Sequence, residues 1–148
     1  MSEKDTNPKD AVGIRKAPFS TVPAEIEAEL GLALLEGARK YGRHNYRVVG
    51  VRASVYYDAA RRHLAAWWEG EDTDPDSGLP HLAKAMASIA VIRDAEINEL
   101  CEDDRPPALR SGWIARLNEL AAKIIDRYPN AKPPFTRSPM QSEGRTHR

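Results

Sequence analysis

The sequence lacks the features that mark several large classes of protein. Its single cysteine, Cys101, excludes an internal disulfide and a cysteine-based zinc site within one chain, which suits a reducing compartment. No apolar run is long enough to span a membrane, and the charged N-terminus has no signal-peptide core. The formal net charge of +0 gives no reason to expect polyanion binding by bulk charge. We therefore expect a soluble, cytoplasmic protein that binds neither membranes nor nucleic acid directly.

The common catalytic motifs are also missing. The chain has no Walker loop, no GxGxxG, no GxSxG, no HExxH and no CxxC, so phosphate-cradle, dinucleotide and zinc-peptidase sites are not supported. A small helical protein without these motifs builds its site from side chains on facing helices. Carboxylates and histidines placed there bind Mg²⁺, Mn²⁺ or iron.

Hydrophobic periodicity predicts an all-α fold, a bundle of about four main helices with no set of strands. The expected helices cover residues 24–41, 51–69, 79–100 and 111–128. The first is apolar almost all round its middle, which predicts a central helix, and the last has one apolar face suited to packing or oligomerisation. Residues 24–128 are expected to form one helical domain. Residues 1–23 are rich in turn formers and predict an extended arm, and residues 129–148 predict a disordered tail.

An acidic turn separates the second and third predicted helices. It carries five carboxylates within eight residues, and like charges this close repel unless a cation lies among them. Glu71, Asp72 and Asp76 are candidate ligands, and His81 comes in the first turn of the next helix. The simpler alternative is a solvated turn. The flanking Trp67-Trp68 pair argues against it, because exposed turns seldom need two tryptophans.

A second candidate site involves Glu36, in the middle of the first helix. Lys40 is four residues further on and can form an ion pair with it. The short loop after this helix is expected to bring Glu36 level with Asp58 on the next helix, where two facing carboxylates would resemble a metal site. Arg62 offers Asp58 a competing partner, and a solvated Glu36–Lys40 pair is the alternative. On the same helix His63 shares one face with Tyr56 and Trp67.

Several spaced blocks of residues carry a family likeness. They are Asn7-Pro8-Lys9-Asp10, Gly37-Ala38 with Lys40-Tyr41-Gly42, Asn45-Tyr46, Arg62-His63-Leu64 with Gly70-Glu71-Asp72, and Asp76-Ser77-Gly78-Leu79-Pro80-His81-Leu82-Ala83. In this order they resemble the phage dATP/dGTP diphosphohydrolases, over roughly residues 7–97. That family is similar to the MazG/HisE all-α NTP pyrophosphohydrolases. The ExxE and ExxD pattern of the MazG proteins is not present, since Glu36 is followed by Arg39 and Asp58 by Arg61.

The resemblance implies a MazG-like bundle that assembles as a homo-oligomer, a dimer or tetramer, and that hydrolyses purine deoxynucleoside triphosphates with the help of Mg²⁺ or Mn²⁺, about two or three ions. It implies cleavage of dATP and dGTP to the monophosphates and pyrophosphate. In a phage this activity would deplete dATP and supply dGMP for 2-aminoadenine nucleotide synthesis, in the cytoplasm of the host cell.

We assign expected roles on this basis. The expected catalytic residues are Glu36, Asp72 and Asp76. The expected metal ligands are Glu36, Asp58, Glu71, Asp72, Asp76 and His81. The expected substrate-binding residues are Lys9, Lys16, Lys40, Asn45, Tyr46, His63, Trp67 and Lys84. Two alternatives remain: a helical partner-binding module without catalysis, and an HD-like phosphohydrolase, which is disfavoured because no adjacent His-Asp pair occurs.

Overall fold

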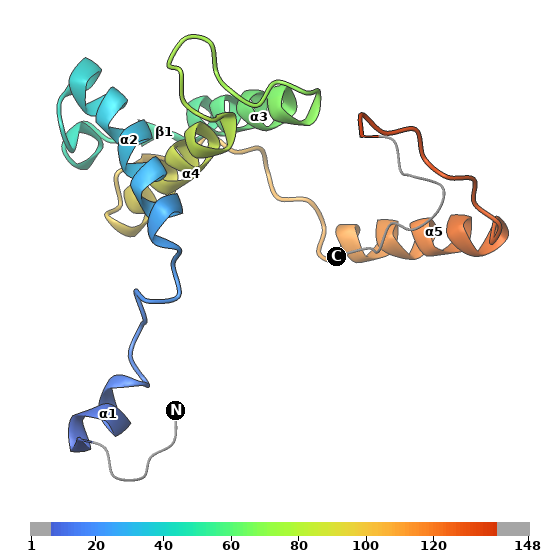
Figure 1. The fold of residues 1–148 in the computed structure, drawn as a ribbon, viewed down its shortest axis with the longest axis horizontal. Helices are drawn as coiled ribbons and strands as arrows, with labels where there is room; N and C mark the ends of the chain where they lie inside the picture. The colour runs from blue at the N-terminus through green and yellow to red at the C-terminus, as the bar shows by residue number, and fades with distance from the viewer. Residues whose placement is uncertain (1–6, 139–148) are drawn as a thin grey trace. The chain divides into compact units, whose positions relative to one another are not determined.

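A computed structural model describes residues 7–138 of the chain. The elements in order are α1 (Pro8–Gly13), α2 (Ala24–Tyr41), the 3₁₀ helix η1 (Asn45–Arg47), β1 (Val51–Arg52), α3 (Ala53–Trp68), α4 (His81–Ile97), β2 (Cys101–Glu102) and α5 (Trp113–Arg127). The strands found among these residues are two residues long. The prediction of an all-α fold is confirmed (Figure 1).

The bounds of α2 agree with those predicted from the sequence. Pro23 precedes the helix in an extended conformation, and its fixed φ favours helix initiation. Gly42 ends the helix with φ of 93°, a value that a residue with a Cβ rarely adopts, and its N–H donates to the Ala38 carbonyl at 2.9 Å. Local signals were sufficient here because both ends are set by residues adjacent to the helix.

A short parallel β-pair, not expected from the sequence, ties α3 to the end of α4. Val51 is in register with Cys101 and Arg52 with Glu102. Gly50 precedes β1 with φ of 82°, and a Cβ at this position would lie 2.5 Å from the Leu100 carbonyl oxygen. This pair could not be expected from the sequence, because two residues are too few to show a period of two.

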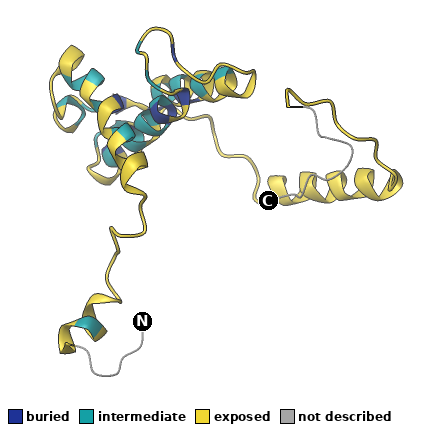
Figure 2. Ribbon diagram, in the orientation of Figure 1, coloured by how far each residue is buried: buried dark blue, intermediate teal, exposed yellow. Residues whose placement is uncertain are grey.

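The central helix of the fold is α4, which packs against both α2 and α3 (Figure 1). Its small residues Ala83, Ala85 and Ala95 are buried, with Ala95 0% exposed, so helices approach closely on two sides. In α2 the only buried residue is Ala33. The prediction of residues 24–41 as the central helix was wrong. Figure 2 shows the buried positions concentrated on α4 and the segments beside it.

The chain divides into two compact units after Pro106. The first unit contains the elements up to β2. The second contains α5, whose described residues are all exposed, including the predicted apolar row Trp113, Leu117, Leu120 and Ile124. The sequence predicted one helical domain continuing to residue 128, whereas the division falls at Pro106-Pro107, where two prolines interrupt the chain.

The described residues near the N-terminus include a short helix, whereas those after α5 have no helix or strand. The predicted extended arm contains a six-residue helix, α1, because the Asn7 side chain accepts a hydrogen bond from the Lys9 N–H and Pro8 suits the first helical position. Residues 129–138 have no helix or strand, and the rest of the predicted tail lies outside the described residues. No helix within residues 7–138 is both long and apolar enough to cross a membrane.

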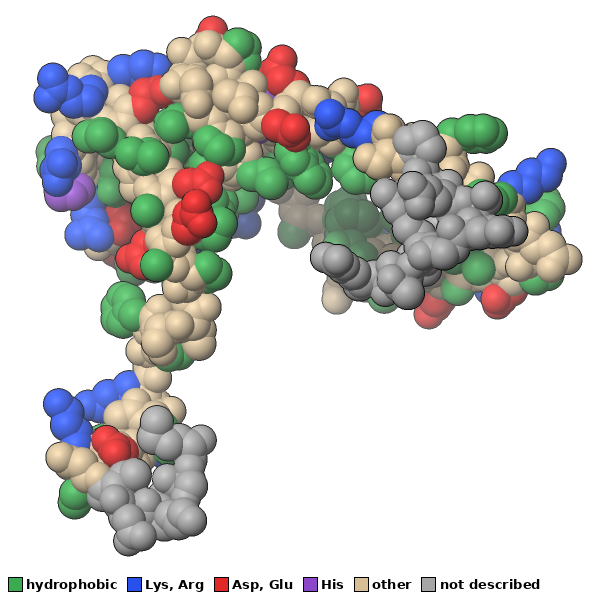
Figure 3. Space-filling model, viewed as in Figure 1, with side chains coloured by type: hydrophobic (Ala, Val, Ile, Leu, Met, Phe, Trp, Pro, Cys, Tyr) green, Lys and Arg blue, Asp and Glu red, His purple; other side chains and the backbone are tan. Residues whose placement is uncertain are grey.

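Figure 3 shows hydrophobic, acidic and basic side chains interspersed over the visible face of the protein. Large surface areas of one charge are not seen there. With a formal net charge of +0, the chain has no bulk attraction for a charged ligand, so a local group of side chains, that of the pocket in the first unit, is described next.

Candidate functional site

A pocket with a volume of ≈ 420 Å³ lies in the first unit. Its walls come from α2, the loop after α2 with η1, α3 and α4. Six of the predicted site residues line it: Glu36, Lys40, Asn45, Tyr46, His63 and Lys84. The structure thus brings together residues that are up to 48 positions apart in the sequence.

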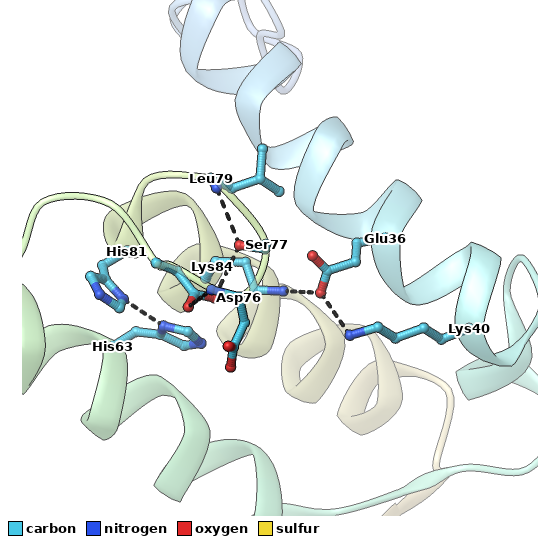
Figure 4. A network of polar contacts seen from close by, with 9 residues as sticks. Glu36, Lys40, His63, Asp76, Ser77, Leu79, His81 and Lys84 are labelled. Atoms are coloured by element: carbon cyan, nitrogen blue, oxygen red, sulfur yellow. Dashed lines mark hydrogen bonds and ion pairs between the residues drawn. The ribbon is translucent and has the colours of Figure 1, made fainter.

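Glu36 lies between two lysines at one wall of the pocket. Lys84 Nζ on α4 donates to Glu36 Oε1 at 2.7 Å, and Lys40 Nζ donates to the same oxygen at 3.1 Å (Figure 4). The hydrogen bond from Lys84, followed by that from Lys40, holds the pKa of Glu36 below its ordinary value. Glu36 is therefore ionised near neutral pH and accepts hydrogen bonds from two ammonium groups. The predicted i,i+4 pair is confirmed, and Lys84 adds a long-range partner.

Two cations and one carboxylate leave this wall with an excess of positive charge. Arg43 also lines the pocket, in the loop after α2. The Lys84 side chain is only 17% exposed, so its interaction with an anion is screened less than that of a fully exposed lysine. This part of the pocket is suited to an anionic group such as a phosphate.

An ion pair with Asp94 on α4 fixes the 3₁₀ turn that carries Asn45 and Tyr46. Arg47, the last residue of η1, donates from Nε and Nη2 to the two carboxylate oxygens of Asp94, at 2.9 and 2.7 Å. The Arg47 hydrogen bonds lower the pKa of Asp94. A bidentate pair fixes direction as well as distance, so the 3₁₀ turn has a defined orientation at the pocket edge.

A pair of histidines connects the pocket to the acidic turn. His63 Nδ1 lies 2.9 Å from His81 Nδ1, and His81 Nε2 lies 2.6 Å from Glu71 Oε1. His81 is 4% exposed, and its backbone N–H donates to the Asp72 carbonyl at 2.9 Å. Burial lowers the pKa of His63, although the nearby Asp74 carboxylate opposes this effect. His63, on α3, lines the pocket.

The acidic turn is organised by Asp74, which sequence reasoning did not assign to the site. Asp74 is 9% exposed and accepts hydrogen bonds from the Asp76 N–H at 3.1 Å and the Ser77 hydroxyl at 3.0 Å. Burial acts to raise its pKa, but these two hydrogen bonds together with the nearby His63 and His81 outweigh it and leave the pKa lowered. Ser77 does not cap the next helix. The cap position is instead Pro80, and Ser77 bonds within the turn.

The predicted metal ligands are dispersed more widely than the predicted substrate contacts. Asp58 is exposed and does not line the pocket, and α2 faces α4 where the sequence led us to expect α3. Both ring nitrogens of His81 are engaged, by Glu71 and His63. Asp72 is exposed. Within residues 7–138 no group of three or more His, Cys, Asp or Glu side chains is arranged to hold a metal ion.

Two carboxylates still suit a metal ion that arrives with a phosphate ligand. Mg²⁺ usually keeps several waters and binds through one or two carboxylates together with substrate phosphates. Glu36 lines the pocket, and Asp76 lies within electrostatic range of Lys40. In Figure 4 the Asp76 side chain is drawn between the side chains of His63 and Glu36. Carboxylates are the ligand type that such an ion uses, although Asp76 is not among the residues that line the pocket.

Three predicted substrate contacts are not among the residues that line this pocket. Lys9 lies in α1 and Lys16 comes shortly after it, and both are exposed. Trp67 is 39% exposed, and its ring centroid lies 6.2 Å from that of Trp68. Tyr41 and Tyr56, which were not assigned to the site, do line the pocket. Tyr56 shares a helix face with His63, and that shared face was the signal that could have placed it there.

Fold and pocket together define an all-α protein with a small pocket whose lining includes two lysines and an arginine. Residues 6–105 match the family model described as dATP/dGTP diphosphohydrolase, N-terminal, so the chain belongs to this family. The resemblance predicted from the sequence blocks is confirmed. The match ends where the first compact unit ends, so the family region coincides with the unit that contains the pocket.

A curated relative carries the same description. The chain is 32% identical over 90 residues to a dATP/dGTP diphosphohydrolase of Salmonella phage PMBT28. That match covers 61% of this chain and 30% of the relative, so the chain corresponds to less than a third of the relative's length. No solved structure matches the chain.

Proposed function

We propose that the chain hydrolyses dATP and dGTP, releasing the monophosphates and pyrophosphate. The observation that carries this proposal is the Lys84–Glu36–Lys40 group in the pocket, found in a chain of the dATP/dGTP diphosphohydrolase family. The pocket volume of ≈ 420 Å³ falls within the usual range for sites that bind small ligands.

The two lysines and Arg43 would bind the triphosphate. Each ammonium now donates to Glu36, and a triphosphate with several charged oxygens competes for the same donors. The purine would lie toward η1, where Asn45 can hydrogen-bond a base edge and Tyr46 can stack on it. A pocket that accepts both purines relies on stacking and on the atoms that adenine and guanine share.

We further propose dependence on Mg²⁺ or Mn²⁺. Glu36 and Asp76 would hold the ion, because a triphosphate that engages the lysines leaves the Glu36 carboxylate free. When bound, a divalent ion neutralises phosphate charge and makes a bound water more acidic. The expected further ligands Asp58, Glu71, Asp72 and His81, and a count of about two or three ions, stay predictions.

The biological role derives from the reaction. In a phage such an enzyme would remove dATP and supply dGMP for 2-aminoadenine nucleotide synthesis in the host cytoplasm. We also propose that the protein assembles as a homo-oligomer, a dimer or tetramer. The support for this is the exposed apolar row on α5.

A substrate panel tests the reaction. The full chain is incubated with dATP, dGTP, dCTP or dTTP, with Mg²⁺, Mn²⁺ or a chelator, and the products are identified by ³¹P NMR. The expected result is monophosphate and pyrophosphate from dATP and dGTP, lost with the chelator. Equal turnover of the pyrimidine nucleotides would contradict the purine assignment. No turnover of any nucleotide would favour a partner-binding module.

A further inference from the structure

Charge is distributed unequally between the two compact units. Residues 1–106 contain 14 Lys and Arg against 19 Asp and Glu, a formal net charge of −5. Residues 107–148 contain eight Lys and Arg against three Asp and Glu, a formal net charge of +5. The two values cancel in the whole chain, and the expectation that the chain binds no nucleic acid rested on that total. A basic segment set apart in this way is typical of chains that bind a polyanion.

Five cations of the second unit are exposed and have no partner among residues 7–138. Their side chains form neither an ion pair nor a hydrogen bond with any described residue; they are Arg110, Arg116, Lys123, Arg127 and Lys132. Glu119 and Asp126 lie within about one helical turn of Lys123, yet neither forms an ion pair with it. The charges of these cations are therefore available to a ligand.

Three of these cations form a basic side of α5, defined by Arg116, Lys123 and Arg127. Their spacing of seven and four residues places them on one side of the helix. At a rise of 1.5 Å per residue the basic side extends over about 16 Å, enough to meet more than one phosphate of a strand. The apolar row that begins at Trp113 lies on the neighbouring side, so the basic side stays available when that row is covered.

An open groove with a volume of ≈ 460 Å³ lies at the start of α5. It is lined by Ala108, Leu109, Arg110, Trp113 and Arg116, and so combines two guanidinium groups with an indole. The first turn of α5 has no acidic residue and no side-chain cap, so its backbone N–H groups add to the positive potential. The groove thus offers phosphate donors together with an aromatic surface.

Exposed aromatic side chains accompany the cations along the second unit. Trp113 is 41% exposed, Tyr128 follows Arg127 directly and is 66% exposed, and Phe135 is fully exposed. An aromatic face stacks on a nucleobase, and a nearby cation binds the adjoining phosphate. The base faces of a duplex are already stacked on one another, so this combination favours a single strand.

We propose that the second unit binds single-stranded nucleic acid, with the basic side of α5 on the phosphates and the exposed aromatic rings on the bases. This inference does not depend on the proposed hydrolysis, because it uses no residue of the pocket in the first unit. DNA and RNA strands share the chemistry that is recognised. The experiment therefore includes both.

Fluorescence anisotropy of the full chain, with a chelator present to prevent hydrolysis, tests the binding. The first probe is a labelled oligo-dT strand of about 20 nucleotides. It should bind at low salt, and a plot of log K against log salt concentration should have a slope of about −2 or steeper, which corresponds to about three phosphate contacts.

A combined variant carrying Arg116→Gln, Lys123→Gln and Arg127→Gln tests the basic side. Its affinity for the oligo-dT strand at low salt should fall by about 10-fold or more, and its salt slope should become shallower by about 2. Arg39→Gln is the control, because Arg39 is exposed on α2 and does not line the pocket. It should bind the strand as the wild type does. Turnover of dATP and sedimentation should be unchanged in both proteins.

Phe135→Ala tests the stacking contact by a separate route. Phe135 is fully exposed, so its removal costs no packing and reports on the ligand alone. Affinity for the oligo-dT strand should fall roughly 5-fold or more, while the salt slope should stay as in the wild type, because no cation is lost.

Four results would overturn the inference. They are an oligo-dT anisotropy that the full chain does not change at low salt, tighter binding of a duplex of the same length, wild-type affinity in both the combined variant and Phe135→Ala, and binding only to vesicles of phosphatidylcholine and phosphatidylglycerol. An oligo-U strand completes the set of probes. Tighter binding of oligo-dT assigns the site to DNA, tighter binding of oligo-U assigns it to RNA, and equal binding shows that it reads what the two share. Any of the four overturning results leaves the proposed hydrolysis standing, since dATP turnover is measured separately.

Discussion

Glu36 connects two helices through a single oxygen, since Lys40 on α2 and Lys84 on α4 both donate to Oε1. Removing Lys84 therefore has two expected effects. The pKa of Glu36 should rise toward its ordinary value, because the Lys84 hydrogen bond is the largest cause that lowers it. KM for dATP should rise roughly 10- to 100-fold, the equivalent of about 1.5–3 kcal/mol for a hydrogen bond to a charged group. Kinetics and ¹³C NMR titration of Lys84→Ala measure both.

Lys123→Ala is the control for this variant, because Lys123 lies on α5 and does not line the pocket. It removes the same charge and should leave both KM and the Glu36 titration as in the wild type. An unchanged KM in Lys84→Ala would show that the ammonium does not contact the nucleotide, whatever the behaviour of Glu36.

At the scale of single residues, local spacing was informative and long-range pairing was not. The Glu36–Lys40 pair follows from an i,i+4 relation and could be predicted. Lys84 could be proposed as a substrate contact only through the family likeness, and its bond to Glu36 depends on how α2 and α4 pack. Asp74 looks like its acidic neighbours in sequence. It differs from them because the turn buries it against the Ser77 hydroxyl, a tertiary effect.

Among the structural elements, η1 depends on the Arg47–Asp94 pair for its orientation at the pocket. Asp94→Asn should misplace Asn45 and Tyr46 and lower kcat/KM, by up to about 100-fold if the shift reaches 1 Å. The helical CD spectrum should persist, because the pair lies on the surface. Kinetics with dATP and dGTP measure the effect. Loss of helical signal together with activity would show instead that the pair supports the whole fold.

The same ion pair predicts a dependence of stability on pH. Arg47 lowers the folded-state pKa of Asp94 below the ordinary value of 3.8, so the unfolded chain binds this proton more readily. The stabilisation is complete above pH 3.8 and is lost as the pH falls from there through the folded-state pKa. Urea unfolding should therefore show a difference between wild type and Asp94→Asn at neutral pH that shrinks on acidification. A constant difference would contradict this.

Gly50 permits the close approach of β1 to Leu100, and a substitution there tests how much this contact stabilises the fold. Gly50→Ala places a Cβ 2.5 Å from a backbone oxygen at a positive φ, and should destabilise the fold by about 1–3 kcal/mol. Gly31→Ala is the matched control, since nothing lies within 4 Å of its Cβ position in α2, and it should stabilise by about 0.5–1 kcal/mol. Urea denaturation compares the two. Equal stabilities would contradict the account of β1.

The helices could be located from sequence because their signals are local: Pro23 and Gly42 bound α2, and a polar turn separates α3 from α4. Which helix packs at the centre could not be predicted from sequence. The apolar middle of residues 24–41 favoured a central helix, yet α4 holds that position, since its alanines allow contact on two sides. Choosing between a leucine-rich and an alanine-rich helix requires knowing which neighbours approach, and that information is absent from periodicity.

For the molecule as a whole, the division after Pro106 separates the unit that contains the pocket from the unit that contains α5. The family match covers residues 6–105, so a chain ending at Pro106 should fold and retain kcat for dATP within about twofold of the full chain. CD spectra and kinetics measure this. A folded but inactive truncated chain would show that the second unit contributes to catalysis.

The exposed row on α5 predicts the self-association of the full chain. Trp113, Leu117, Leu120 and Ile124 recur on one helix face and are between 41% and 57% exposed, so pairing two copies removes apolar surface from water. Sedimentation of the full chain should show a dimer or tetramer, and Leu117→Glu should shift it toward the monomer.

Ala122→Glu is the control for this variant, because it adds the same charge on the opposite side of the helix and should leave the assembly intact. Because the pocket lies in the other unit, the Leu117→Glu protein should still bind dATP. Assembly that survives Leu117→Glu would assign the interface to another surface of the chain.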